Sequence, residues 1–250
     1  MSQRAAFSLV ELSIVLVILG LLTGGILAGK SLIRASELRS ISTEFSRFVT
    51  ARTTFRDKYF AVPGDMANAY SFWGNSCGTN TTTLSTGCNG NGDGIIEPDN
   101  STGESVKAWE HLARAGLVEG GFDGTGTVIN SGTSVALSAT NVPSSKLPKG
   151  AWDMSNFSGN CVGSDGCAKT FMSFGELYTG GDSETVYPHS TLKHEEAWNI
   201  DTKMDDGQAN SGFMRGDSGD LCFDTGTDYY GIAAAGGSYA GDCMFYFQQR

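Results

Sequence analysis

A short run of oxygen-bearing side chains alternates with glycine in the segment Asn89-Gly90-Asn91-Gly92-Asp93-Gly94-Ile95-Ile96-Glu97. Oxygen ligands at alternate positions, glycine at a sharp turn and then a backbone carbonyl follow the ligand order of an EF-hand calcium loop. The pattern predicts a calcium site formed by Asn89, Asn91, Asp93, the carbonyl of Ile95 and Glu97. Binding should be weak, because Asn89 replaces the usual first aspartate and Asn100 stands where that loop has glutamate. The alternative is a polar turn without a metal.

Motifs of known catalytic sites are incomplete in this sequence. The segment from Gly216 to Asp220 is similar to the nucleophile loop of chymotrypsin-like proteases, but it ends in aspartate where that loop has glycine. His194-Glu195 lacks the second histidine of a zinc-protease helix. Because no acid, base and nucleophile converge, we expect a protein that is not an enzyme.

One carboxylate, Glu11, lies within an otherwise apolar stretch from Phe7 to Gly29. A helix of this length extends roughly 34 Å, which is enough to cross a bilayer. A charge inside such a segment costs on the order of 3 kcal/mol, so it indicates a functional role and a cationic partner.

The residues before this stretch form a short polar leader that contains Arg4 and ends in a small residue, Ala6. A secretory signal would place its small residues after the apolar run. The leader, followed by F-S-L-V-E-L from Phe7, resembles the class III signal of type IV pilins and type II secretion pseudopilins. The resemblance implies that a prepilin peptidase cleaves between Ala6 and Phe7 and methylates the new amine of Phe7. Ala6 departs from the family pattern, which usually has glycine before the cleavage site.

Cleavage supplies a cation for Glu11, because the nitrogen of Phe7 becomes a charged terminus that methylation need not neutralise. The partner amine belongs either to the same subunit or to a neighbouring subunit, and only the second pairing sets a register between helices. The alternative is a signal anchor whose glutamate lies near the membrane interface.

Apolar residues past the membrane segment continue the helical pattern. They predict one helix from about Ser8 to Tyr59, which Pro63 and Gly64 end. The domain organisation is then a leader at 1–6, a transmembrane and filament-core helix at 7–29, an amphipathic continuation at 30–60 and a globular head at 61–250. The membrane segment also contains glycines that either allow close helix packing or lose helicity on assembly, namely Gly20, Gly24, Gly25 and Gly29. The apolar stripe of the continuation consists of Leu38, Ile41, Phe45, Phe48, Phe55 and Tyr59.

The head reads as short elements joined by turns. Helices are predicted at Glu104 to Ala115, with Thr102 as cap and Gly116 past its end, and at Thr191 to Met204. The segment from Gly74 to Gly94 is expected to be an irregular loop. Strands that should form an antiparallel sheet are predicted at 127–129, 134–138, 170–177, 220–223, 229–233 and 243–247. A long helix packed on such a sheet is an α+β fold, which is also the pilin-like fold that the resemblance implies.

Composition favours an exported protein. The chain has 17 basic and 27 acidic residues, a formal net charge of -10, which is unfavourable for nucleic acid. An even number of cysteines after the apolar segment fits disulfides in an oxidising compartment. The spacing does not define the pairing, and sequential pairing is our working hypothesis. It joins Cys77 to Cys88, Cys161 to Cys167 and Cys222 to Cys243.

The charges beside the apolar segment disagree with export, because Lys30, Arg34 and Arg39 follow it while Arg4 precedes it. Charge bias alone would place the head in the cytoplasm. The leader and the cysteines instead indicate a bacterial inner-membrane protein whose head lies outside the cytoplasm and then joins a periplasmic or cell-surface filament.

The acidic residues Asp201, Asp205 and Asp206 lie in a segment that resembles one found in pilin-like sequences. We interpret it as a helix end and turn, with a metal site as the alternative. Taken as a whole, the resemblance implies a structural subunit of a type IV pilus-like or type II secretion pseudopilus filament. The alternative is a minor or tip pilin that acts as an adhesin. The resemblance implies these partners for the protein: prepilin peptidase, identical or related pilin subunits, an inner-membrane assembly platform and, before assembly, the membrane.

Overall fold

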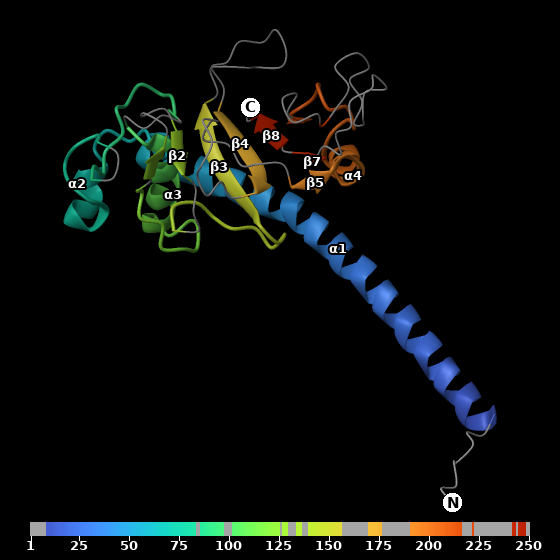
Figure 1. Cartoon of the computed structure of the whole chain (residues 1–250). Helices are drawn as coiled ribbons and strands as arrows, with labels where there is room; N and C mark the ends of the chain where they lie inside the picture. The colour runs from blue at the N-terminus through green and yellow to red at the C-terminus, as the bar shows by residue number, and fades with distance from the viewer. Residues whose placement is uncertain are drawn as a thin grey trace, which may run out of the picture. The chain divides into compact units, whose positions relative to one another are not determined.

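The computed structural model describes 9–83, 86–97, 102–125, 127–129, 134–136, 140–156, 170–176, 191–216, 222, 242–243 and 245–248 of the 250 residues. The chain divides into two compact units, Met1–Arg39 and Ser40–Arg250. Helix α1 (Leu9–Tyr59) belongs to both (Figure 1). The predicted long helix is thereby confirmed, although Ser8 lies outside the described residues.

The first unit contains the apolar part of α1. Among the described residues, α1 is the one helix long and apolar enough to cross a membrane, by length and composition. Its hydroxyl groups bond to the helix backbone: Ser13 Oγ donates to the carbonyl of Val10 at 2.9 Å, and Thr23 Oγ1 to that of Leu19 at 2.9 Å. These polar side chains are therefore satisfied without water.

The second unit is an α+β structure. Its helices, besides the end of α1, are α2 (Ala69–Trp73), the 3-10 helix η1 (Gly74–Cys77), α3 (Glu104–Arg114) and α4 (His194–Met204). Its strands are β1 (Thr127–Ile129), β2 (Ser134–Ala136), β3 (Gly150–Asn156), β4 (Thr170–Glu176), β5 (Leu192–Lys193), β6 (Met214–Gly216), β7 (Asp242–Cys243) and β8 (Phe245–Gln248).

The main sheet has the order β3-β4-β8-β6 and is antiparallel throughout (Figure 1). Two further antiparallel pairs are β1 with β2 and β5 with β7. Because side chains alternate along a strand, one face of the main sheet is apolar. It carries Trp152, Met154, Met172, Phe174, Phe245, Phe247 and Met214, all of them buried.

The end of α1 packs against this apolar face. The rings of Phe45 and Phe247 have centroids 4.4 Å apart, and Phe48 meets Trp152 edge-on at 5.6 Å. Phe48 also meets Trp109 of α3 at 4.9 Å, so the helix fills the space between the sheet and α3. The predicted stripe is buried at Ile41, Phe48 and Phe55 and half-buried at Leu38, Phe45 and Tyr59.

Both predicted head helices exist: α3 begins at Glu104 as predicted but has a different cap, and α4 begins later than predicted. The N-cap of α3 is Gly103, whose positive φ of 63° suits glycine, and Thr102 instead donates its hydroxyl to Glu97 Oε2 at 3.3 Å. Residues Leu192 and Lys193, predicted as helix, form β5, because they pair with β7 before α4 begins at His194.

The strand predictions were partly wrong. The segment predicted at 243–247 is divided, because Cys243 pairs with Leu192 while residues 245–248 join the main sheet. Strands β3 and β6 were missed. In β3, G-A-W-D-M-S-N, Trp152 and Met154 alternate with Asp153 and Ser155, but the run is short and contains Gly, Ala, Asp and Asn, which are infrequent in strands. The segments predicted at 220–223 and 229–233 lie outside the described residues, apart from Cys222, which lies in a bend.

Candidate functional site

The candidate calcium loop is folded around the carboxylate of Asp65, which lies before it in the sequence. Asp65 Oδ1 accepts the backbone N–H groups of Gly92 at 2.6 Å and Asp93 at 3.1 Å, and its Oδ2 accepts that of Gly94 at 2.9 Å. Burial raises the pKa of Asp65, and these N–H groups oppose that shift. Asp65 thus fixes the turn that the glycines allow.

A second carboxylate, Glu104 at the start of α3, holds the same loop. It accepts the N–H of Asn91 at 2.8 Å and that of Glu97 at 3.3 Å. Burial and a hydrogen bond with the carboxyl of Glu97 raise the pKa of Glu104 to about 9. The raised pKa of Glu104 favours its protonated form at neutral pH, in which it can donate a hydrogen bond to the carboxylate of Glu97.

Three of the predicted ligand side chains lie together. Asn91 Nδ2 donates to both carboxylate oxygens of Glu97, at 3.0 and 3.1 Å, and to Asp93 Oδ2 at 3.3 Å. Asp93 Oδ1 also accepts the N–H of Ile95 at 2.9 Å, which tightens the turn. Asn100 lies outside the described residues.

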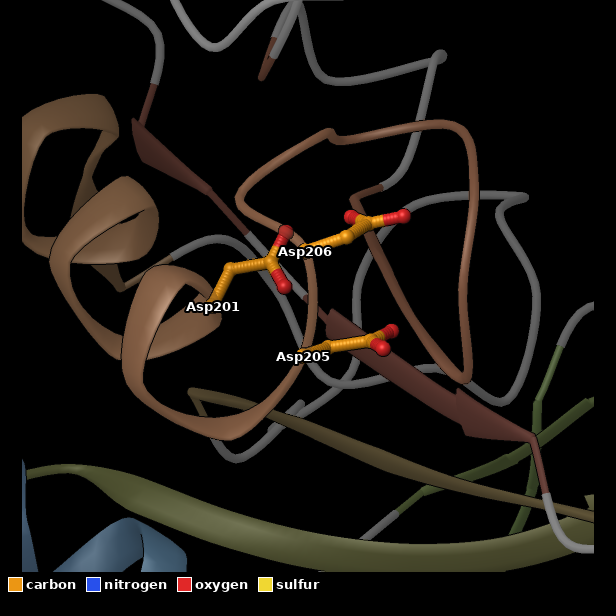
Figure 2. A group of neighbouring side chains, drawn as sticks. All are labelled: Asp201, Asp205 and Asp206. Carbon is orange, nitrogen blue, oxygen red and sulfur yellow. The ribbon is translucent and has the colours of Figure 1, made fainter.

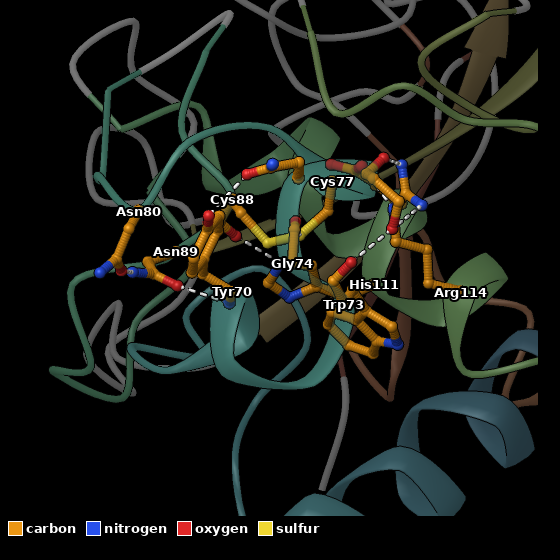
Figure 3. Close-up of a disulfide and its surroundings, with 12 residues drawn as sticks. Tyr70, Trp73, Gly74, Cys77, Asn80, Cys88, Asn89, His111 and Arg114 are labelled. Atoms are coloured by element: carbon orange, nitrogen blue, oxygen red, sulfur yellow. Dashed lines mark hydrogen bonds and ion pairs between the residues drawn. A yellow bond between two sulfur atoms is a disulfide. The ribbon is translucent and has the colours of Figure 1, made fainter.

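The first predicted ligand, Asn89, is engaged elsewhere. Its Oδ1 accepts the N–H of Tyr70 in the first turn of α2 at 2.9 Å, and its Nδ2 donates to Asn80 at 2.8 Å (Figure 3). Asn89 is buried, so these bonds cap α2 and fix the chain before the loop. The side chain of Asn89 is therefore occupied by hydrogen bonds outside the loop in this structure, and its place among the calcium ligands stays a prediction.

The same region contains a disulfide and a buried histidine (Figure 3). Cys77, in η1, is joined to Cys88 with a Cα–Cα distance of 5.1 Å. His111 Nδ1 accepts the N–H of Gly64 at 3.0 Å, and its Nε2 donates to the carbonyl of Cys88 at 2.8 Å. Burial lowers the pKa of His111 to about 4, so the ring is neutral. The segment from Gly74 to Gly94, predicted to be irregular, therefore contains the 3-10 helix η1 and a disulfide.

Two further cysteines, Cys222 and Cys243, are joined with a Cα–Cα distance of 4.7 Å, and Cys243 belongs to β7. Cys161 and Cys167 lie outside the described residues. The two pairs in the structure are both sequential, and neither is close to the apolar segment of α1 in the sequence.

The acidic group at the end of α4 forms a turn (Figure 2). Asp205 Oδ2 accepts the N–H groups of Phe213 at 2.5 Å and Met214 at 3.1 Å, and Asp206 Oδ1 accepts that of Gln208 at 2.8 Å. One oxygen from each of Asp201, Asp205 and Asp206 lies within 4.8 Å of the others. The hydrogen bonds account for a helix end and turn, and a cation at this group stays a hypothesis.

The N-terminal segment presents apolar side chains on all sides of α1. Among the exposed residues are Leu12, Leu16 and Leu19. Exposed apolar surface of this extent requires a membrane or partner helices. Glu11 lies in the first turn and is exposed, whereas Ala6 and Phe7 lie outside the described residues.

The glycines of this segment leave open surface on the helix. A Cβ atom built at Gly20, Gly24, Gly25 or Gly29 meets nothing within 4 Å. The spacing gives two pairs four residues apart, Gly20 with Gly24 and Gly25 with Gly29, which is the arrangement that lets two helix backbones approach closely. None of the residues that the structure describes fills this space.

Comparison with known proteins identifies this segment. Residues 1–27 match the family model described as the prokaryotic N-terminal methylation motif. The chain carries a class III signal. No curated protein and no solved structure matches the chain. The methylation motif covers the leader, Phe7, Glu11 and the glycines up to Gly25, so the recognised sequence and the exposed apolar helix coincide.

Proposed function

We propose that this protein is a structural subunit of a type IV pilus-like or type II secretion pseudopilus filament. The observation that carries the proposal is that the methylation motif at 1–27 continues without a break into α1, whose apolar side chains are exposed in the single chain. A helix of this kind is held by the membrane before assembly and by other subunits afterwards. The head then lies outside the cytoplasm.

In this proposal, prepilin peptidase cleaves between Ala6 and Phe7 and methylates the amine of Phe7. The methylated amine remains a cation, and Glu11 of an adjacent subunit pairs with it in the filament core. Because a charge in a dry environment requires a partner, this ion pair fixes how far one helix is shifted along the next. Identical or related subunits and an inner-membrane assembly platform are the partners.

The assembly role of Glu11 is tested by following Glu11→Ala in membrane and filament fractions of the native host. We expect the variant to enter the membrane and to be absent from sheared filaments, because its neighbour's amine has lost its partner. Glu37→Ala is the matched control, since Glu37 lies on the same helix beyond the motif and pairs with Arg34 at 3.3 Å. Filament incorporation of Glu11→Ala at the level of Glu37→Ala would contradict the proposal.

We further propose that the loop from Asn91 to Glu97 binds calcium. The support is that the side chains of Asn91, Asp93 and Glu97 lie together beside Glu104. A divalent cation would replace the proton between Glu97 and Glu104, and the carbonyl of Ile95 would supply a neutral ligand. Affinity should be modest, with a dissociation constant on the order of 0.1 to 1 mM.

Calorimetric titration of the full-length protein in detergent with calcium chloride tests this site. We expect saturable binding, proton release that is detected by comparing buffers of different ionisation enthalpy, and loss of binding in Asp93→Asn. Glu119→Gln, which changes an exposed carboxylate outside the loop and outside the acidic group at the end of α4, should bind as the parent does. Equal affinities in Asp93→Asn and the parent would place any bound calcium elsewhere.

A further inference from the structure

The second unit has a cavity beside the end of α1. Its volume is about 660 Å³, and it lies between the last turn of α1, residues 61–68 and the glycines of the candidate calcium loop. This volume is within the range of small-molecule sites, roughly 300 to 1,000 Å³. The walls combine aromatic rings with polar side chains, which is the composition of a site that orients a ligand.

Phe60, on the wall of the cavity, has an unfavourable backbone conformation and an exposed ring. It follows α1 directly, has a positive φ of 54° and is 92% exposed. Backbone strain in a residue with a Cβ and an exposed phenyl ring each cost roughly 1 to 3 kcal/mol. A ligand that covers the ring would recover the second of these terms, while the backbone conformation at the end of α1 would stay as it is.

Tyr59 supplies a second ring whose orientation is fixed. It packs against Phe55 at 4.5 Å, against Phe72 at 5.3 Å and against Trp73 at 5.6 Å between ring centroids. Lys58 Nζ also lies 5.0 Å from the centroid of this ring, so a ligand would contact the edge of Tyr59, whose position is already fixed. Tyr59 and Phe60 together form an aromatic edge to the cavity.

The polar groups of the cavity are available to a ligand. Asn68 stands at the N-cap of α2 but makes no side-chain cap bond, because Asn89 bonds the N–H of Tyr70 in its place. Within the described part of the chain, neither Asn68 nor Asp57 makes a side-chain hydrogen bond or ion pair. Arg56 adds a guanidinium beside them.

The opposite wall is rigid before any ligand arrives. Asp65 is buried and binds the N–H groups of Gly92 and Gly94, whose positive φ values of 83° and 89° suit glycine. The disulfide between Cys77 and Cys88 restrains the segment that directly precedes Gly92 in the sequence. Preformed walls reduce the entropy that binding would otherwise cost.

We propose that this cavity binds a short neutral oligosaccharide. Sugar rings present apolar C–H faces that stack on an exposed aromatic ring such as Phe60 and can contact the edge of Tyr59. Their hydroxyls bond to planar groups such as those of Arg56, Asp57 and Asn68. An apolar ligand would leave these polar groups desolvated without partners. An anionic ligand is disfavoured, because two aspartates line the cavity with one arginine and the chain carries a net charge of -10.

The test uses the full-length chain in micelles of a detergent without a sugar headgroup, so it does not depend on filament assembly. The probes are maltose, lactose, cellobiose and N,N′-diacetylchitobiose, each titrated by saturation-transfer NMR and calorimetry. We expect at least one disaccharide to bind saturably, with a dissociation constant on the order of 1 mM. Failure of all of them to bind would overturn the proposal.

Variants separate binding from folding. Phe60→Gly removes the ring and relieves the positive φ, so the melting temperature should not fall while affinity falls about tenfold. Asn68→Ala should weaken binding comparably. Trp198→Ala, which removes a 47% exposed ring on α4, is the matched control and should bind as the parent does. Unchanged affinity in Phe60→Gly and Asn68→Ala would place the sugar elsewhere and overturn the assignment.

Discussion

Trp152 donates its indole N–H to Oε2 of Glu44 at 2.8 Å and so joins β3 to α1. The other oxygen, Oε1, accepts the backbone N–H of Lys146 at 3.0 Å. Both carboxylate oxygens are therefore satisfied although Glu44 is buried beside the aromatic core. This pair sets the position of the helix along the sheet, because a shift of one turn would leave the carboxylate buried without donors.

Glu44→Ala should destabilise the head by about 1 to 3 kcal/mol, since the N–H groups of Trp152 and Lys146 would lose their acceptor in a buried site. Glu44→Gln retains one acceptor oxygen and should cost less. The measurement is chemical unfolding of the full-length protein in detergent, followed by tryptophan fluorescence. Equal stabilities of the alanine variant and the parent would show that this pair does not hold the helix on the sheet.

The sequence predicts the long helix well because a continuous apolar run from Phe7 to Gly29 is followed by apolar side chains at helical spacing up to Tyr59. It does not predict Glu44, although that residue lies on the same face as Ile41 and Phe48. A glutamate in a helix is ordinarily interpreted as solvent-exposed, and its partner Trp152 is distant in the sequence. The N-terminal assembly segment is recognisable because its signal is local.

The head is less predictable, because its contacts join residues far apart in the sequence. Asp65 and Glu104, which hold the candidate calcium loop, lie outside the loop and carry no spacing signal, apart from the acidic start of α3. Asn89 fits the ligand order yet caps α2, and only tertiary structure distinguishes the two roles. The cavity beside Phe60 depends on a backbone conformation that composition does not reveal.

Glu104→Gln should flatten the pH dependence of stability. The pKa of Glu104 is raised to about 9 in the folded protein from an ordinary 4.5, so the folded state binds a proton that the unfolded state loses. Stability from this group is present below the unfolded pKa and is lost as pH rises toward 9. Glutamine mimics the protonated carboxyl. In urea titrations between pH 5 and 9, the free energy of unfolding should fall more for the parent than for Glu104→Gln. If it falls equally with pH in both proteins, the raised pKa of Glu104 is contradicted.

His111 should make the head sensitive to acid. Its pKa is lowered from an ordinary 6.5 to about 4 in the folded protein, so the unfolded state binds the extra proton between these values. Stability from this group is complete above pH 6.5 and is lost as pH falls toward 4.

The variant His111→Phe tests this assignment. It should be less stable at pH 7, because Gly64 and Cys88 lose their buried hydrogen-bond partners, and its stability should vary less between pH 6.5 and 4. Thermal unfolding over this pH range is the measurement. An unchanged acid profile in His111→Phe would assign the sensitivity to other groups.

Gly24→Leu should block filament incorporation while membrane insertion is retained. A Cβ at Gly24 meets no atom of the described residues within 4 Å, and leucine favours the helix by up to about 1 kcal/mol, so we expect any loss to come from neighbouring helices. Gly24→Ala distinguishes the two roles of these glycines. Packing predicts that alanine is nearly tolerated, whereas a need to lose helicity predicts that alanine already impairs assembly. The readout is the amount of each variant in sheared filaments relative to membranes.

Intact-mass analysis of the chain recovered from purified filaments tests the central claim most directly. We expect a mature protein that begins at Phe7 with one added methyl group and retains the whole of α1. A filament-borne or secreted chain that begins after Gly29, with the apolar helix removed, would contradict the account.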